Sequence, residues 1–315
     1  MDEDINATYI TLSGYVEVEK YRYVYCVIMF TVYILIICCN STIVCLIVIH
    51  KNLHEPMYIF IAALLINSVL YSTAIYPKLL VDFLSEKQII SHLLCHFQYF
   101  IFYTLGGSEF LLLAAMAYDR YVSICKPLQY PTIMTKTTIS IVLVLAWLVP
   151  ASQVVGSAIL SAKTKLCSFT LKGIFCNNSI HKLHCVSSRG ALNIYGFVIF
   201  VNAAILPVLF TLFTYTRIFV ISYQSCREVR RKATQTCLPH LLVLLNFTCL
   251  SAYDVLLLRV ETDFPKTLSL IMTLQVVLYH PLFNPIIYGL KMKEISKHLK
   301  RLFCPGKIVK TVNSL

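Results

Sequence analysis

The sequence predicts an all-α membrane protein, a seven-transmembrane helix bundle with a short amphipathic eighth helix. Of its 315 residues, 58% are hydrophobic and only 13% are charged, which is too apolar for a soluble domain of this length. Seven apolar segments each approach or exceed the ~20 residues that a helix needs to cross a bilayer. These segments are roughly 23–49, 57–81, 96–118, 138–160, 192–215, 238–258 and 268–290.

The segment that follows the seventh span predicts a helix that lies on the membrane surface. In residues 291–303, the apolar side chains of Ile295, Leu299 and Phe303 stand between basic residues, as they do in an interfacial amphipathic helix. Cys304, at the end of this segment, is a candidate palmitoylation site.

The basic residues predict how the chain is oriented in the membrane. Seven spans place the two termini on opposite sides, and lysine and arginine gather on one side, above all in residues 227–232 and 291–310. By the positive-inside rule this side is cytoplasmic. Residues 1–22 are then an extracellular N-terminus, residues 23–290 the transmembrane domain, and residues 291–315 a cytoplasmic helix and tail. The net charge of +12 reflects this topology and contact with anionic lipid, so nucleic acid is not an expected partner.

Four of the 13 cysteines fall in segments that are predicted to be extracellular. On the oxidising side they imply two disulfide bonds, and their spacing leaves all three pairings open. The same side carries glycosylation sequons at Asn6 and Asn177. The four cysteines are Cys95, Cys167, Cys176 and Cys185.

Four motifs at the ends of the predicted spans carry a resemblance to a known family. The motifs are LHEPMY at 53–58, MAYDRYVSIC at 116–125, KATQTCLPH at 232–240 and PLFNPIIY at 281–288. With these motifs in order, the chain resembles the odorant (olfactory) receptors of the rhodopsin-like (class A) G-protein-coupled receptor family. The third motif is most similar to fish-type odorant receptors, and the resemblance covers nearly the whole chain.

The resemblance implies a multi-pass receptor of the plasma membrane that binds a small-molecule odorant in the extracellular half of the bundle. Such a receptor would activate the stimulatory, olfactory-type heterotrimeric G protein and raise cAMP. It would not be an enzyme and would need no cofactor or metal. The resemblance also implies a disulfide bond between Cys95 and Cys176, which leaves Cys167 to pair with Cys185.

By resemblance, Asp119 and Arg120, followed by Tyr121, control coupling to the G protein. A local ion pair would hold Arg120 inactive, and an outward movement of the sixth span would free it to contact the G protein. Many relatives restrain this arginine with an acid on the sixth span. Here residues 230–232 are basic and only Glu228 lies nearby, so we expect a weaker resting lock.

The same resemblance places a second switch near the end of the seventh span. Pro285 removes a backbone hydrogen bond and lets the helix bend, with Asn284 beside it. Tyr288 and Tyr215 would then meet near the cytoplasmic end of the bundle.

The chain departs from the family pattern inside the bundle. Ser68 stands where rhodopsin-like receptors generally carry a sodium-binding aspartate, which leaves open whether a sodium or proton site exists. Phe247 and Thr248 stand where relatives have a tryptophan or tyrosine toggle. Glu109 is then the buried acid in the middle of the bundle, where a charge is costly. We expect it either to be a neutral acid that is hydrogen-bonded between helices or to take part in activation.

The ligand pocket is expected in the outer half of the bundle, beneath the disulfide-tied loop. Helical spacing predicts one face each from the third and sixth spans, and two leucines of the seventh span add an apolar wall. Each residue could instead pack against a neighbouring helix. Phe102 occupies the depth at which amine receptors carry an aspartate, so a simple aminergic ligand is not expected. The expected lining residues are Phe102, Tyr103, Gly106, Gly107, Thr248, Ser251, Ala252, Val255, Arg259, Leu274 and Leu278.

Arg259, at the outer end of the sixth span, predicts the ligand class. A guanidinium group that points into the pocket could bind a carboxylate in bidentate geometry, which favours a polar or anionic odorant. The alternative is a cation at the membrane interface that extends into water and pairs with Glu261 or Asp263.

Two other classes of protein, and one other kind of receptor, are alternatives to an odorant receptor. A transporter or channel is expected to show internal repeats or several intramembrane charges, and the sequence has neither. An intramembrane enzyme needs a nucleophile with a base or clustered metal ligands, a spacing that the histidines do not have. A rhodopsin-like receptor for another small molecule remains an open alternative.

Overall fold

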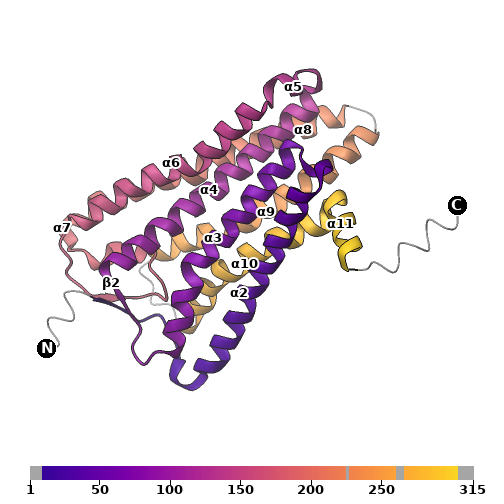
Figure 1. The fold of residues 1–315 in the computed structure, drawn as a ribbon. Coiled ribbons are helices and arrows are strands. Elements are labelled where there is room, and N and C mark those ends of the chain that lie inside the picture. The colour runs from indigo at the N-terminus through magenta and orange to yellow at the C-terminus, as the bar shows by residue number, and fades with distance from the viewer. Residues whose placement is uncertain (1–8, 225–226, 260–265, 304–315) are drawn as a thin grey trace.

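The computed structural model describes residues 9–224, 227–259 and 266–303, which are mostly helical and form an elongated bundle (Figure 1). Short 3-10 turns, η1 (Lys51–Leu53) and η2 (Pro127–Gln129), and the short helix α5 (Tyr130–Ile133) join the helices at one end. The long helices of the bundle are α2 (Val18–Ile49), α3 (Pro56–Leu84), α4 (His92–Cys125), α6 (Lys136–Ala162), α7 (Val186–Phe200) continued by η4 (Val201–Ile205) and α8 (Leu206–Tyr223), α9 (Arg227–Arg259) and α10 (Lys266–Lys291).

Local sequence accounts for several helix boundaries. The hydroxyl group of Ser91 accepts the backbone N–H of Leu94 at the start of α4, at 3.3 Å. Thr135 caps α6 in the same way. Pro56 occupies the first turn of α3, where its missing N–H costs no helical hydrogen bond. Between α7 and α8, the segment η4 is a wider π-type turn, so the two helices form one continuous element.

Among the described residues, six helices are long and apolar enough to cross a membrane. The sixth predicted span lies in α9, whose apolar part is the shorter stretch Cys237–Ala252. The apolar windows of α3 and α4 are 61% and 67% buried inside the bundle, against 17–39% for the other four of these six spans. Helices α3 and α4 therefore form the centre, and the others present apolar faces outward, as expected toward lipid.

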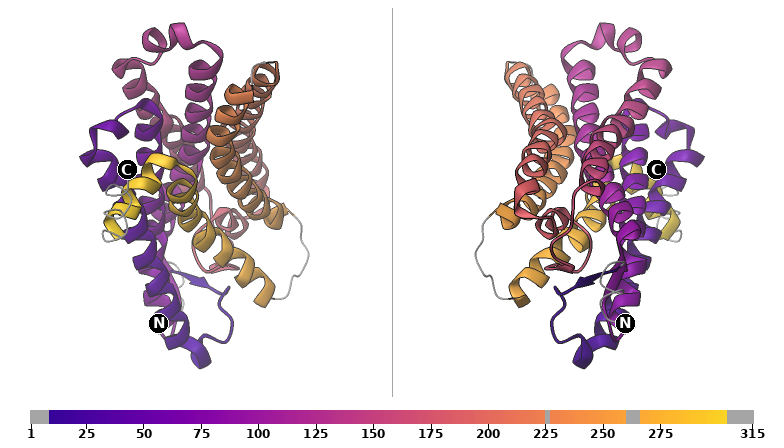
Figure 2. Two further views of the ribbon diagram at one scale, coloured as in Figure 1. Left: turned by 90° about the vertical axis from the view of Figure 1, so that its right-hand side faces the viewer. Right: turned by 90° about the vertical axis from the view of Figure 1, so that its left-hand side faces the viewer.

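A small sheet lies at the end of the bundle where α4 begins (Figure 2). Strand β1 (Tyr9–Leu12) pairs antiparallel with β2 (Ile89–Ser91) and parallel with β3 (Thr170–Leu171). The side chains of Ile10 and Leu12 are buried beneath it. The sequence analysis did not predict this strand in the N-terminal segment.

Both disulfide bonds lie at the same end, which we call the disulfide end. Cys95 pairs with Cys176 and Cys167 with Cys185, with Cα–Cα distances of 5.4 and 5.0 Å. This is the pairing that the resemblance implies. The loop between α6 and α7, which contains β3 and the turn η3 (Asn178–Leu183), is thereby tied to the start of α4. The opposite end, where α4 finishes, is called the Asp119 end.

The predicted amphipathic helix is α11 (Lys293–Phe303), which follows α10 almost directly. It packs beside α2 and α10 (Figure 2). Its apolar face buries Ile295, while Leu302 and Phe303 are exposed. Cys304 lies outside the described residues.

Candidate functional site

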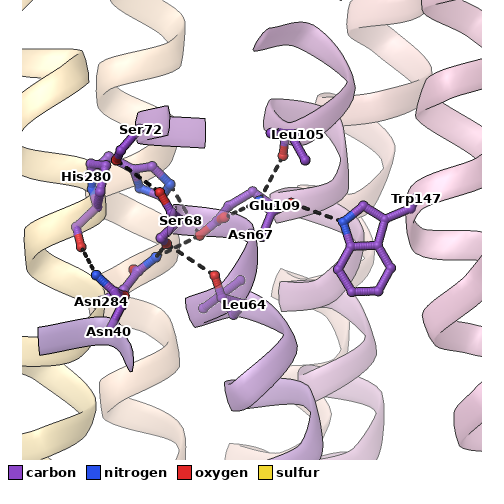
Figure 3. Close-up of polar contacts among 11 residues, drawn as sticks. Asn40, Leu64, Asn67, Ser68, Ser72, Leu105, Glu109, Trp147, His280 and Asn284 are labelled. Carbon is purple, nitrogen blue, oxygen red and sulfur yellow. Dashed lines mark hydrogen bonds and ion pairs between the residues drawn. The ribbon is translucent and has the colours of Figure 1, made fainter. Parts of the chain in front are cut away.

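A cluster of polar side chains lies in the middle of the bundle, closed to solvent (Figure 3). We call it the central polar cluster. Most of its members come from α3, α4 and α10, the two central helices and their neighbour. Burial of so many polar atoms requires that they satisfy one another. The members are Asn40, Asn67, Ser68, Ser72, Glu109, Trp147, His280 and Asn284.

Glu109 is the centre of this cluster and is fully buried. Its Oε2 accepts a hydrogen bond from Nδ2 of Asn67 at 2.8 Å, and its Oε1 accepts one from Nδ2 of Asn284 at 2.9 Å. Nε2 of His280 lies 3.3 Å from the same Oε1. The expected hydrogen bonding between helices is therefore present, whereas a role of Glu109 in activation stays a prediction.

Asn284, which the sequence assigned to the second switch, is held by this cluster. Besides Glu109 it donates to the hydroxyl group of Ser68 at 2.9 Å. Asn40 donates to the carbonyl oxygen of Pro281 at 3.1 Å and so ties α2 to the same turn of α10. These bonds stabilise the stretch of α10 that precedes Pro285, where the helix lacks a backbone donor.

Two members of the cluster were missed in the sequence. The histidines entered the sequence interpretation only as possible groups of an enzyme site, and Asn67 did not enter it. A signal was available for His280, because it precedes Asn284 by four residues and so shares its helix face. Asn67 directly precedes Ser68, a position that the family comparison had already singled out.

At the Asp119 end, the expected ion pair between Asp119 and Arg120 is present, with Nε of Arg120 at 2.8 Å from Oδ2 of Asp119. The side chain of Asp119 is fully buried, and that of Arg120 is 8% exposed. Tyr130, from the first turn of α5, donates its hydroxyl hydrogen to the other carboxylate oxygen at 2.8 Å. Burial and then the neighbouring carboxylate raise the pKa of Tyr130, so its hydroxyl group stays a donor.

No hydrogen bond joins Tyr215 to Tyr288 among the described residues, so their meeting stays a prediction. The hydroxyl group of Tyr288 lies 3.3 Å from Nδ1 of His240, a histidine of α9. Tyr215 is buried against Ala117 and Cys237, and its hydroxyl group has no hydrogen-bond partner in the part of the chain that the structure describes. In this arrangement His240, and not Tyr215, is the hydrogen-bond partner of Tyr288.

The expected ligand-lining residues of α4 separate into two groups. Phe102 is 5% exposed and packs against Tyr71, Tyr103 and Phe175, with ring centroids 4.9–5.0 Å apart. The hydroxyl group of Tyr103 accepts the backbone N–H of Asn178 at 2.9 Å. Both residues therefore hold the loop of the disulfide end onto α4.

Gly106 and Gly107 face different surroundings. A Cβ atom on Gly106 would meet nothing within 4 Å. On Gly107 it would lie 2.9 Å from Cβ of Pro150 and 3.4 Å from Cβ of Ala203. The prediction for Gly107 is thus corrected: this glycine lets α4 pack closely on α6 and η4. The two lie on different sides of α4 because successive residues are about 100° apart around a helix.

In α9 the aromatic contact is made by Phe247. Its ring centroid lies 4.5 Å from that of Phe110 and 4.2 Å from that of His280. The neighbouring Thr248 has a buried hydroxyl group without a hydrogen-bond partner among the described residues. Ser251 and Ala252 are half-buried.

The remaining expected ligand-lining residues are two leucines of α10 and two residues near the end of α9. Leu274 and Leu278 pack at the edge of the aromatic cluster that contains Phe102. The backbone of α9 ends at Arg259, but the side chains of Val255 and Arg259 lie outside the described residues, as do Glu261 and Asp263. The side chain of Glu228 is also outside them.

Asn177, the predicted glycan acceptor in the loop of the disulfide end, is buried in this structure. It follows Cys176 of the disulfide bond and is only 8% exposed. Its side-chain oxygen accepts the backbone N–H of Ser179 at 3.1 Å, so it caps the turn η3. A glycan at Asn177 stays a prediction, and Asn6 lies outside the described residues.

These features define a class of protein. A bundle of membrane-spanning helices with a disulfide bond from the start of its third helix, and an Asp–Arg pair at the other end of that helix, is the architecture of a rhodopsin-like G-protein-coupled receptor. The chain belongs to the olfactory receptor family, whose model matches residues 29–306. It is accordingly a multi-pass membrane receptor with seven transmembrane helices, and not an enzyme.

Individual relatives agree with this assignment. The chain is 33% identical over 313 residues to olfactory receptor 10K1 of Homo sapiens, with 95% of this chain and 96% of that receptor covered. It is 34% identical over 305 residues to the olfactory receptor-like protein COR2 of Gallus gallus, with 94% and 95% covered. Because these relatives are human and chicken proteins, the fish-type subclass stays a prediction.

Proposed function

We propose that this receptor binds a small odorant in the disulfide half of the bundle and activates a stimulatory heterotrimeric G protein, which raises cAMP. The disulfide end faces the outside of the plasma membrane and the C-terminus faces the cytoplasm. The observation that carries this proposal is the arrangement along α4. Cys95 fixes the start of α4 beneath the disulfide-tied loop, and near the other end Asp119 accepts hydrogen bonds from Arg120 and Tyr130, each at 2.8 Å.

The orientation follows from chemistry at the two ends. Disulfide bonds form on the oxidising side of a membrane, which makes the disulfide end extracellular. The Asp119 end and α11 carry the basic residues that the positive-inside rule assigns to the cytoplasm. A glycan at Asn6 and a palmitoyl group at Cys304 would be consistent with this orientation.

The ligand site is proposed above an aromatic floor. Phe110, Phe247 and His280 form this floor through ring contacts between α4, α9 and α10. One helical turn nearer the disulfide end, Gly106 of α4 and Ser251 of α9 follow on the same faces. The open space at Gly106 provides room for a ligand atom there.

Thr248 offers the ligand a polar contact. A buried hydroxyl group without a partner costs about 1–3 kcal/mol, and a ligand that exchanges a hydrogen bond with it removes this cost. A polar odorant is therefore favoured over a hydrocarbon. If Arg259 also points into the bundle, the preferred odorant is anionic.

The test is an odorant screen in cells that express the receptor, with cAMP as the readout. The panel contains carboxylates and neutral odorants of matched size. A response that is lost in Arg120→Ala at normal surface expression supports the proposed coupling, and a retained response contradicts it. If a carboxylate odorant activates the receptor, Arg259→Ala should weaken the potency of that odorant far more than the potency of a neutral odorant. Equal shifts for both would end the assignment of Arg259.

A further inference from the structure

The hydrogen bonds around Glu109 show which groups face its two carboxylate oxygens. The indole N–H of Trp147 can only donate, and it points at Oδ1 of Asn67 at 3.1 Å. The carbonyl oxygen of Leu105 can only accept, and it receives Nδ2 of Asn67 at 3.0 Å. The amide of Asn67 is thus fixed in orientation, so the group that it presents to Oε2 of Glu109 is an N–H donor.

The same reasoning fixes the second amide. The hydroxyl group of Ser68 donates to the carbonyl oxygen of Leu64 at 3.1 Å, so toward Asn284 it acts as an acceptor. Asn284 must therefore present its NH₂ group to Ser68 and, with it, to Oε1 of Glu109. Each oxygen of Glu109 accepts a hydrogen bond from an amide of fixed orientation (Figure 3).

His280 is the remaining partner and the one that can carry charge. One proton can lie between Oε1 of Glu109 and Nε2 of His280. If Nδ1 of His280 also carries a proton, the carboxylate and the imidazole together have no net charge. Without that second proton the pair carries one negative charge, which is costly in a site that is 0–1% exposed. Among the described residues, no lysine or arginine forms an ion pair with Glu109, and Ser68 supplies no charge.

Two aromatic rings pack against the imidazole ring of His280. Its other nitrogen, Nδ1, has no hydrogen-bond partner among the described residues. The ring instead faces Phe247 of α9 at 4.2 Å and Tyr71 of α3 at 5.9 Å between centroids. Aromatic faces attract a cation at such distances. Tyr71 and Glu109 are the titratable side chains in these contacts, since Phe247 does not titrate.

We propose that Glu109 and His280 form a proton-binding site in the middle of the bundle, and that the bound proton supplies the positive charge that this buried carboxylate requires. The site joins α4 to α10 beside the bend at Pro285. It also holds His280 against Phe247, the floor of the proposed ligand site. The proposed ligand of the central polar cluster is thus a proton, and a sodium ion is the alternative that the test separates from it.

The test measures the thermal stability of the purified receptor in detergent across a pH series from about 6 to about 9. A proton that the folded receptor binds more tightly than the unfolded chain is released as the pH rises, so the melting temperature should fall with rising pH. The fall should be on the order of 2 °C per pH unit in the range where the proton is lost. Glu109→Gln and His280→Asn should each remove this alkaline fall.

His240→Asn is the matched control, because His240 is equally buried but contacts Tyr288 and no acid. It should keep the alkaline fall. If Glu109→Gln keeps the wild-type slope, or if the wild type shows no slope, the proposal is wrong. The wild-type series remains decisive where a variant fails to fold.

Exchange of sodium for choline at constant ionic strength tests the inorganic alternative. An unchanged melting temperature supports the proton, whereas a marked loss of stability without sodium would assign the counter-charge to the metal ion and overturn the proposal. None of these measurements uses an odorant or a G protein. Their outcome is therefore independent of whether the proposed signalling function is correct.

Discussion

Tyr130 donates its hydroxyl hydrogen to Oδ1 of Asp119 at 2.8 Å, on the carboxylate oxygen that Arg120 does not use. The two oxygens of Asp119 thus bind different elements, one the next residue of α4 and one the short helix α5. Tyr130 lies in the loop after α4, so its bond fixes the position of that loop relative to the ion pair. In the proposed switch, release of Arg120 therefore involves this loop as well as the sixth span.

Replacement of Tyr130 by phenylalanine should raise ligand-independent cAMP at equal surface expression. The change removes a hydrogen bond to a buried charged group, which is worth about 1.5–3 kcal/mol. If the bond exists only in the resting state, the active population rises about tenfold for each ~1.4 kcal/mol. Asp119→Asn should raise the basal signal further because it weakens both bonds.

Thr132→Ala is the matched control for this prediction. Thr132 lies on the same short helix, is exposed, and donates its hydroxyl hydrogen to the carbonyl oxygen of Gln129. Its replacement should leave the basal signal unchanged. A Tyr130→Phe receptor with wild-type basal cAMP would show that the bond is not part of the resting lock.

Loss of the disulfide bond at Cys95 should prevent surface expression. Removal of such a bond commonly costs about 2–5 kcal/mol. The partners of the Cys95–Cys176 bond are 81 residues apart and those of the Cys167–Cys185 bond 18, so the longer loop closure should matter more, by about 1 kcal/mol. Cell-surface staining relative to total protein measures the effect.

The expected order of surface expression is wild type, then Cys167→Ser, then Cys95→Ser. Cys45→Ser serves as the control, since Cys45 is a free cysteine on the exposed face of α2. Normal surface staining of Cys95→Ser would contradict the prediction.

Acid should destabilise the disulfide end through His181. This residue is 6% exposed and lies 3.3 Å from the hydroxyl group of Tyr99. Burial, then the neighbouring imidazoles of His184 and His96, lower its pKa from 6.5 to about 4. As the pH falls through this window, the unfolded chain binds a proton that the folded one does not, so up to about 3 kcal/mol of stability is lost.

His181→Asn should flatten the acid side of the stability curve. The melting temperature of the purified receptor between about pH 7 and about pH 4 measures this. His54→Asn is the control, because His54 is an exposed histidine near the Asp119 end. This variant should lose as much stability in acid as the wild type does. An unchanged acid slope in His181→Asn would assign the sensitivity to other groups.

Sequence reasoning worked where one helix determines the outcome and failed where two elements must meet. The spans and α11 follow from apolar length and periodicity, which are local properties. Nothing in the sequence near Tyr130 or His280 indicates their partners Asp119 and Glu109, because these contacts exist only in the folded chain. The strand β1 has a weak signal, since Ile10 and Leu12 alternate with Tyr9 and Thr11, but four residues become a strand only through pairing with β2 and β3.

The two adjacent glycines of α4 give the last prediction, because they separate packing from ligand binding. Gly107→Ala would place a methyl group 2.9 Å from Cβ of Pro150, which forces α4 and α6 apart and should cost about 1–3 kcal/mol. Gly106→Ala meets no atom within 4 Å, and alanine favours the helix over glycine by about 0.5–1 kcal/mol. Melting temperature should therefore fall for Gly107→Ala and hold or rise for Gly106→Ala.

Ligand response should show the opposite order. Gly106→Ala fills space above the floor formed by Phe110 and Phe247, so the dose response to an active odorant should shift while surface expression stays normal. The larger Gly106→Leu should shift it further. If Gly106→Leu folds and responds like the wild type, the ligand does not occupy the space beside Gly106, and the proposed site must lie elsewhere in the bundle.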